Sequence, residues 1–148
     1  GPTLERILGH VRFTALYLLS ALGGGVVSYF FSDITTVSVG ASGAIFGLMG
    51  ALVVAGRRLR YDVTQVLVLL GINVDIGFLA PGIDWRAHLG GLVTGALVAA
   101  ILVHAPRKSR TFIQVAGLGG VLLILVAVAM LRTSQIQELL APLGVITT

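Results

Sequence analysis

Ser42 and His88 are the residues whose types and surroundings fit acyl-transfer chemistry. Ser42 lies in the stretch GASG (residues 40–43), and His88 lies in the stretch AHLGG (residues 87–91). A serine hydroxyl is a weak nucleophile at neutral pH and needs a base within hydrogen-bonding reach, which a histidine can supply. The two residues could therefore form a catalytic dyad, provided that the fold brings them together.

The composition is that of a membrane protein. The chain has 148 residues, of which 56% are hydrophobic and 11% charged, and its mean hydropathy is +1.01; soluble domains rarely have such values. It lacks cysteine, and we expect no metal and no cofactor. We predict an all-α polytopic transmembrane helix bundle, a single domain over residues 1–148. Runs of near-membrane length lie at Val11–Phe31, Val39–Gly56, Val63–Ala80, Ala87–Ala105 and Phe112–Leu131.

The basic residues alternate between loops, which predicts the orientation of the spans. By the positive-inside rule, the segments rich in arginine and lysine are cytoplasmic, whereas residues 32–38 and 81–86 are external. The net charge of +4 thus reflects topology, and we expect no nucleic-acid partner. The cytoplasmic basic residues are Arg6, Arg12, Arg57, Arg58, Arg60, Arg107, Lys108 and Arg110.

This topology places Ser42 and His88 at the same depth. Both the second and the fourth span run from outside to inside, and each of the two residues falls within about one turn of the outer end of its span. The free N–H groups at a helix start beside Ser42 would also stabilise an oxyanion. A shallow site that opens outward has access to the water that hydrolysis requires.

Small residues predict that the two spans pack closely. Gly40, Gly43, Gly47 and Gly50 share a face of the second span, and His88, Gly91 and Gly95 share a face of the fourth. Such faces let membrane helices approach each other. A lone serine in a glycine-rich helix is more often a packing residue, so the case for catalysis depends on the matching depth of the pair.

These motifs resemble those of the rhomboid family of intramembrane serine proteases. Residues 40–43 match the family's G-x-S-G, and residues 87–95 match its A-H-x-x-G-x-x-x-G. The lead-in GIDW (residues 82–85) and the upstream run of Glu5, Gly9, Arg12, Phe13 and Tyr17 also resemble the family pattern. The likeness covers about residues 1–105.

The resemblance implies roles for individual residues. Ser42 and His88 would form a dyad without an acidic third member, with Gly40, Gly43 and Phe46 supporting the oxyanion and the histidine. Many bacterial members have tyrosine at the position of Phe46. Glycines Gly47, Gly91 and Gly95 would pack the helices. Asp84 is expected to cap the fourth span, and Asp75 is expected not to be catalytic.

The resemblance also implies that two earlier core helices are missing, one of which carries a His-x-x-x-Asn motif that helps bind the oxyanion. The first four spans would be core helices three to six, and the fifth an extra C-terminal helix. We therefore expect a fragment with an open apolar side that turns over little or no substrate by itself.

Three functions fit the sequence. The first is an intramembrane serine endopeptidase that cleaves membrane-anchored protein substrates near the outer face. The second is a catalytically inactive relative that binds transmembrane clients. The third, a small transporter or channel subunit, is disfavoured by the scarcity of midplane charges. We expect a multi-pass protein of a bacterial plasma membrane whose partners are transmembrane proteins and the lipid bilayer; substrate identity and oligomeric state do not follow from the residues.

Overall fold

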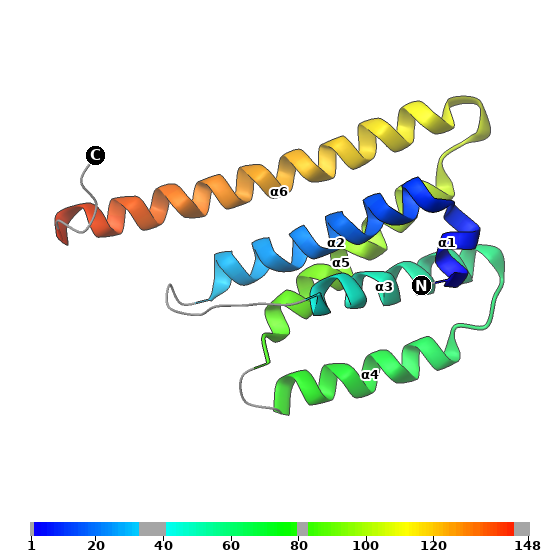
Figure 1. Ribbon diagram of the computed structural model, residues 1–148, viewed down its shortest axis with the longest axis horizontal. Coiled ribbons are helices and arrows are strands. Elements are labelled where there is room, and N and C mark those ends of the chain that lie inside the picture. Colours follow the sequence, from blue (N-terminus) through cyan, green and yellow to red (C-terminus); the bar gives the residue numbers. More distant parts are fainter. Residues whose placement is uncertain (1, 33–40, 80–82, 144–148) are drawn as a thin grey trace.

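The protein is a bundle of helices, as the sequence predicts (Figure 1). The computed structural model describes residues 2–32, 41–79 and 83–143. Within these ranges the elements are α1 (Pro2–Leu8), α2 (His10–Phe31), α3 (Ser42–Leu59), α4 (Thr64–Leu79), α5 (Trp85–His104), the short 3-10 helix η1 (Arg107–Ser109), α6 (Arg110–Leu140) and the 3-10 helix η2 (Ala141–Leu143).

Four helical stretches of the described chain are long and apolar enough to cross a membrane: α2, α3, α5 and Arg107–Leu140. The third predicted span, residues 63–80, corresponds to α4, which has 16 residues. At about 1.5 Å per residue α4 is roughly 24 Å long, shorter than a hydrocarbon core of about 30 Å. Of the five predicted runs of near-membrane length, four are found as membrane-length helices and the third as the shorter apolar helix α4.

Helix α5 is central, because it packs against both α2 and α3, which also contact each other. The half of this three-helix unit near the basic loops is filled by larger apolar side chains. The opposite half, where α3 and α5 begin, is packed through glycines. The buried apolar cluster includes Leu16, Leu19, Ala51, Ala55, Val98, Ala99 and Leu102.

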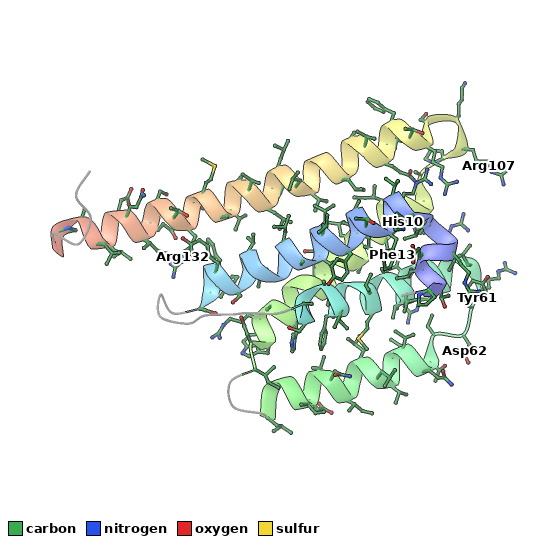
Figure 2. The ribbon with its side chains drawn as sticks, viewed as in Figure 1. His10, Phe13, Tyr61, Asp62, Arg107 and Arg132 are labelled. Atoms are coloured by element: carbon green, nitrogen blue, oxygen red, sulfur yellow. The ribbon has the colours of Figure 1, made fainter. Side chains whose placement is uncertain are left out.

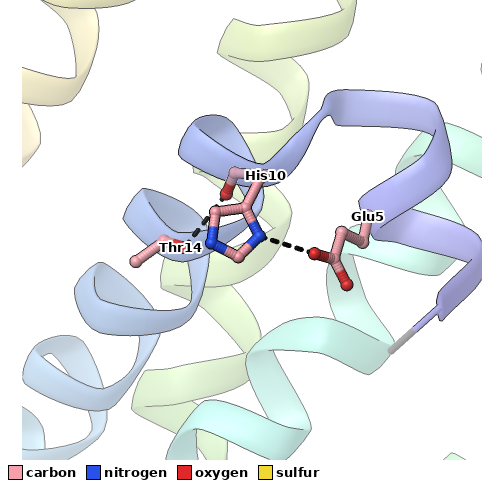
Figure 3. Close-up of polar contacts among 3 residues, drawn as sticks. All are labelled: Glu5, His10 and Thr14. Carbon is pink, nitrogen blue, oxygen red and sulfur yellow. Dashed lines mark hydrogen bonds and ion pairs between the residues drawn. The ribbon is translucent and has the colours of Figure 1, made fainter.

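The short helix α1 was not predicted. It is separated from α2 by Gly9, whose φ of 83° is unfavourable for residues with a side chain. Leu4 and Leu8 are buried against the core. Across the break, the His10 ring nitrogen Nδ1 lies 2.7 Å from Glu5 Oε1, and the Thr14 hydroxyl donates to the His10 carbonyl (Figure 3).

Helix α6 runs along α2 and continues past the predicted end at Leu131 to Leu140 (Figure 1). Near its start, buried Gln114 donates to the Leu102 carbonyl and accepts a hydrogen bond from Arg12 Nε, both at 2.8 Å. Toward its other end, the hydroxyls of Tyr29 and Thr133 lie 3.1 Å apart. Polar contacts thus fix α6 to the bundle at both ends.

The basic loops of residues 57–60 and 107–110 lie at the same end of the bundle, as the loop pattern predicts (Figure 1). His10, Tyr61, Asp62 and Arg107 lie at this end, and Arg132 lies toward the other (Figure 2). Arg132 stands apart from the basic loops, and its guanidinium lies 5.9 Å from the ring centroid of Phe30. Helices α3 and α5 both begin at the end opposite the basic loops (Figure 1).

Candidate active site

Ser42 is the first residue of α3, and Ala41 before it provides no side-chain cap. The first N–H groups of a helix have no partner within the helix, and the positive end of the helix dipole lies beside them. Ser42 is half-buried, and Gly43 after it is buried. The start of α3 therefore combines a hydroxyl with backbone donors that can stabilise a negative charge.

Asp84 holds the start of α5 in place. Its Oδ1 accepts hydrogen bonds from the backbone N–H groups of Arg86 at 3.1 Å and Ala87 at 3.3 Å. The expectation that Asp84 caps this helix is confirmed. Its other oxygen accepts a hydrogen bond from the Ser28 hydroxyl on α2. The helix turn that carries His88 is thereby tied to α2 as well.

The expected contact between the glycine faces of α3 and α5 is present. A Cβ atom added at Gly91 would overlap the backbone of Gly43, and one added at Gly95 would overlap the backbone of Gly47. Closer to the helix starts, a Cβ at Gly43 would lie 3.1 Å from the Ala87 carbonyl oxygen. Gly43, which follows Ser42, and Ala87, which precedes His88, are therefore in backbone contact.

The imidazole of His88 is stacked on the ring of Phe46, with the centroids 4.2 Å apart and the planes 7° apart. The expected packing of Phe46 on His88 is thus confirmed. His88 Nδ1 is buried and has no hydrogen-bond partner within the described part of the chain. It faces α4, because a Cβ added at Gly77 would lie 3.3 Å from this nitrogen.

Ser42 lies one helical turn before Phe46, on the same face of α3. Its neighbour Gly43 is packed on Ala87. No hydrogen bond joins the side chains of Ser42 and His88, both of which the structure describes. In proteins without bound substrate such catalytic hydrogen bonds are often long or poorly aligned.

A small cavity of about 50 Å³ borders the inner side of the histidine. It brings α4 and the first residue of α5 to the site, a contribution that the sequence did not indicate. Gly77 and Val74 share a face of α4, but no spacing in the sequence relates that face to His88. The cavity is lined by Phe46, Val74, Gly77, Trp85, His88, Leu89 and Leu92.

In the described part of the chain, neither Asp75 nor His104 forms a hydrogen bond with Ser42 or His88. Gly40 lies outside the described residues. Asp75 is exposed on α4. His104, at the opposite end of α5 from His88, contacts the Ala100 carbonyl at 3.0 Å. Within the described ranges no three histidine, cysteine, aspartate or glutamate side chains gather as a metal site would require.

Comparison with known proteins agrees with the resemblance to the rhomboid family. The family model described as "Rhomboid domain" matches residues 1–105. The Arabidopsis thaliana RHOMBOID-like protein 4 is 38% identical over 114 residues, which are 72% of this chain and 28% of the relative. Rhomboid protease GluP of Bacillus subtilis is 40% identical over 107 residues, 69% of this chain and 21% of the relative.

A third relative, the putative rhomboid protease YdcA of Bacillus subtilis, is 35% identical over 117 residues, 76% of this chain and 58% of the relative. The alignments with these three relatives thus cover between 21% and 58% of the relatives' own lengths. No solved structure matches the chain significantly.

Proposed function

The chain belongs to the rhomboid family, and from this we propose that it is an intramembrane serine endopeptidase. Its substrates would be membrane-anchored proteins, cut near the outer face of the membrane, where α3 and α5 begin. The bacterial plasma membrane remains the predicted location. The proposed reaction uses Ser42 as nucleophile and His88 as base, and it uses no cofactor.

In the first step the Ser42 hydroxyl oxygen forms a bond to the carbonyl carbon of the substrate peptide while its proton passes to His88. We assign the proton to Nε2, because Nδ1 is buried against α4 without a partner. The carbonyl oxygen becomes negative. Backbone N–H groups at the start of α3, including that of Gly43, would donate hydrogen bonds to it.

In the second step the tetrahedral intermediate collapses. The C–N bond breaks, and the imidazolium of His88 gives its proton to the departing amine. Water then attacks the Ser42 ester while His88 accepts its proton. The C–O ester bond breaks, His88 returns the proton to the Ser42 oxygen, and the product with the new carboxyl group leaves. Hydrolysis of the ester needs water, which is accessible because both helix starts lie at the end of the bundle (Figure 1).

The observation that most strongly supports this proposal is the stack of His88 on Phe46. Phe46 is one turn from Ser42, and the backbones on either side of the pair touch at Gly43 and Ala87. The imidazole is therefore held next to the helix turn that carries the hydroxyl.

A fluorophosphonate probe, which phosphonylates activated serines, tests the proposal in native membranes. We expect labelling of the native protein and none of Ser42→Ala. The matched control is Ser134→Ala, which removes an exposed hydroxyl from α6 and should be labelled normally. Labelling of Ser42→Ala at the native level would refute the assignment of the nucleophile.

A second candidate function is that of an inactive relative that binds transmembrane clients. It is favoured by the missing hydrogen bond between Ser42 and His88. In that case native protein would not react with the probe, yet it would co-purify with a transmembrane protein after mild crosslinking, and Ser42→Ala would co-purify with it equally well.

A further inference from the structure

A second, larger cavity lies at the opposite end of the bundle from Ser42. Its volume is about 500 Å³, within the range of about 300–1,000 Å³ typical of small-molecule sites. It is bordered by the junction of α1 and α2, the end of α5 and the first turns of α6. Its lining is mainly apolar, with a few polar groups: His10, Arg12, Thr111 and Gln114.

The charge of Arg12 in this cavity is not compensated. The half-buried guanidinium donates to two neutral oxygens, Gln114 Oε1 at 2.8 Å and the Leu8 carbonyl at 3.3 Å. Among the described residues, no carboxylate forms an ion pair with Arg12. The carboxylate of Glu5, on the neighbouring helix α1, contacts His10 instead. An arginine has five N–H donors, and the remaining ones are available to a ligand.

The guanidinium is also held in position. Gln114 is 5% exposed, and its amide bridges Arg12 Nε and the Leu102 carbonyl. Three helices therefore fix the direction of one cation. A fixed guanidinium with free N–H groups is well suited to a phosphate oxygen, to which arginine forms strong charge-assisted hydrogen bonds.

The surroundings favour a lipid as the source of the phosphate. Val115 is 68% exposed and lines the cavity together with Leu118, so apolar surface continues from the polar groups along α6. The same end of the bundle carries the basic loop with Arg107 and Lys108, which the positive-inside rule makes cytoplasmic. Basic pockets between helices on that side are suited to anionic headgroups.

We propose that this cavity, between α2 and α6, binds the headgroup of an anionic phospholipid of the inner leaflet. The phosphate accepts hydrogen bonds from Arg12, the Thr111 hydroxyl is a further donor at the rim, and the acyl chains follow the apolar surface of Val115 and Leu118. The site is at the far end of the bundle from Ser42, and the proposal does not depend on catalysis.

Native mass spectrometry of the detergent-purified protein tests this proposal with two lipids of identical acyl chains, phosphatidylglycerol and phosphatidylcholine. We expect Arg12→Gln to lower retention of phosphatidylglycerol at least about tenfold, the effect of losing one charge-assisted hydrogen bond, and to lower retention of phosphatidylcholine less, because its choline group already compensates the phosphate charge. The control Arg58→Gln removes an equal charge from an exposed position on α3 and should retain the preference. Equal losses in both variants would mean general surface attraction and would overturn the site.

Two further measurements complete the test. Val115→Trp fills the cavity from its open side while leaving Arg12 intact, so it decides the question if Arg12→Gln does not fold; we expect the same loss of phosphatidylglycerol, and full retention would refute the proposal. Excess glycerol phosphate should not displace the lipid. Displacement would instead identify a site for soluble phosphate esters.

Discussion

The imidazole of His88 lies flat on the ring of Phe46, 4.2 Å between centroids. This contact joins the second turn of α3 to the start of α5. It covers one face of the histidine, while Gly77 on α4 approaches the buried Nδ1. The ring is thus restricted from two sides without a hydrogen bond to orient it, and its position depends on packing.

We predict that Phe46→Leu lowers the cleavage rate of a transmembrane reporter about three- to tenfold, because stacked ring pairs contribute about 0.5–1.5 kcal/mol. Phe46→Tyr keeps the ring and should retain most activity. Phe112→Leu alters a ring that is 76% exposed and serves as the control. If Phe46→Leu were as active as the native protein, packing would not orient the histidine.

In the full-length protein, Ser42→Ala and His88→Ala should each reduce the single-turnover cleavage rate by about 10⁴-fold or more, since residues that act as a unit fail together. The double variant should be no slower than either single variant. Cleavage in proteoliposomes measures the rates. Multiplicative losses in the double variant would show that the two residues act independently.

Gly91→Ala should destabilise the protein by about 1–3 kcal/mol, because its methyl group would overlap the backbone of Gly43 and force α3 and α5 apart. Gly119→Ala on α6, where nothing lies within 4 Å of an added Cβ, is the matched control and should be neutral or slightly stabilising. Thermal unfolding in detergent compares them. Equal stability of the two variants would contradict close helix contact.

Asp84→Ala should cost about 1 kcal/mol through the lost helix cap, whereas Asp84→Asn, which can still cap, should cost less and retain substantial turnover. Asp75→Asn, on an exposed position of α4, should also remain active. Unfolding and reporter cleavage are measured on the same preparations. If folded Asp75→Asn lost as much cleavage activity as Ser42→Ala, a catalytic triad would be indicated instead of a dyad.

Asp62 lies in the loop before α4. The hydrogen bonds from the side chain and the backbone N–H of Thr64 hold the pKa of its carboxyl below the usual 3.8. A lowered pKa stabilises the folded state above the unfolded-state value, and this contribution disappears as the pH falls through the folded-state value. NMR titration of Asp62 should therefore show a higher pKa in Thr64→Val, and an unchanged pKa would disprove this cause.

Much of the fold follows from the sequence because four of the five apolar runs form helices of the length that a bilayer demands. The predicted start of α2 at Val11 and end of α5 at Ala105 each differ from the structure by one residue. Helix α1 was missed because seven residues are too few to show periodicity. The extension of α6 was missed because polar residues such as Gln135 and Glu138 end the apolar run while still favouring helix.

The candidate site was predictable only in part. The stack of Phe46 on His88 follows from helical spacing, because Phe46 shares a face with Ser42 and the glycines bring α5 to that face. The bond from Ser28 to Asp84 and the approach of Gly77 depend on how α2 and α4 are rotated. Residue spacing within one helix carries no information about rotation of another.

Helix α6 has 31 residues and is therefore about 46 Å long, well beyond a hydrocarbon core of about 30 Å. Its apolar run, Phe112–Leu131, is about 30 Å long and matches an average bilayer, so the helix tilts more in a thinner bilayer. Because Arg12 with Gln114 and Tyr29 with Thr133 attach it to α2 near both of its ends, its tilt is passed on to α2. Through Ser28 and Asp84, α2 supports the turn that carries His88, so bilayer thickness is mechanically connected to the placement of the histidine.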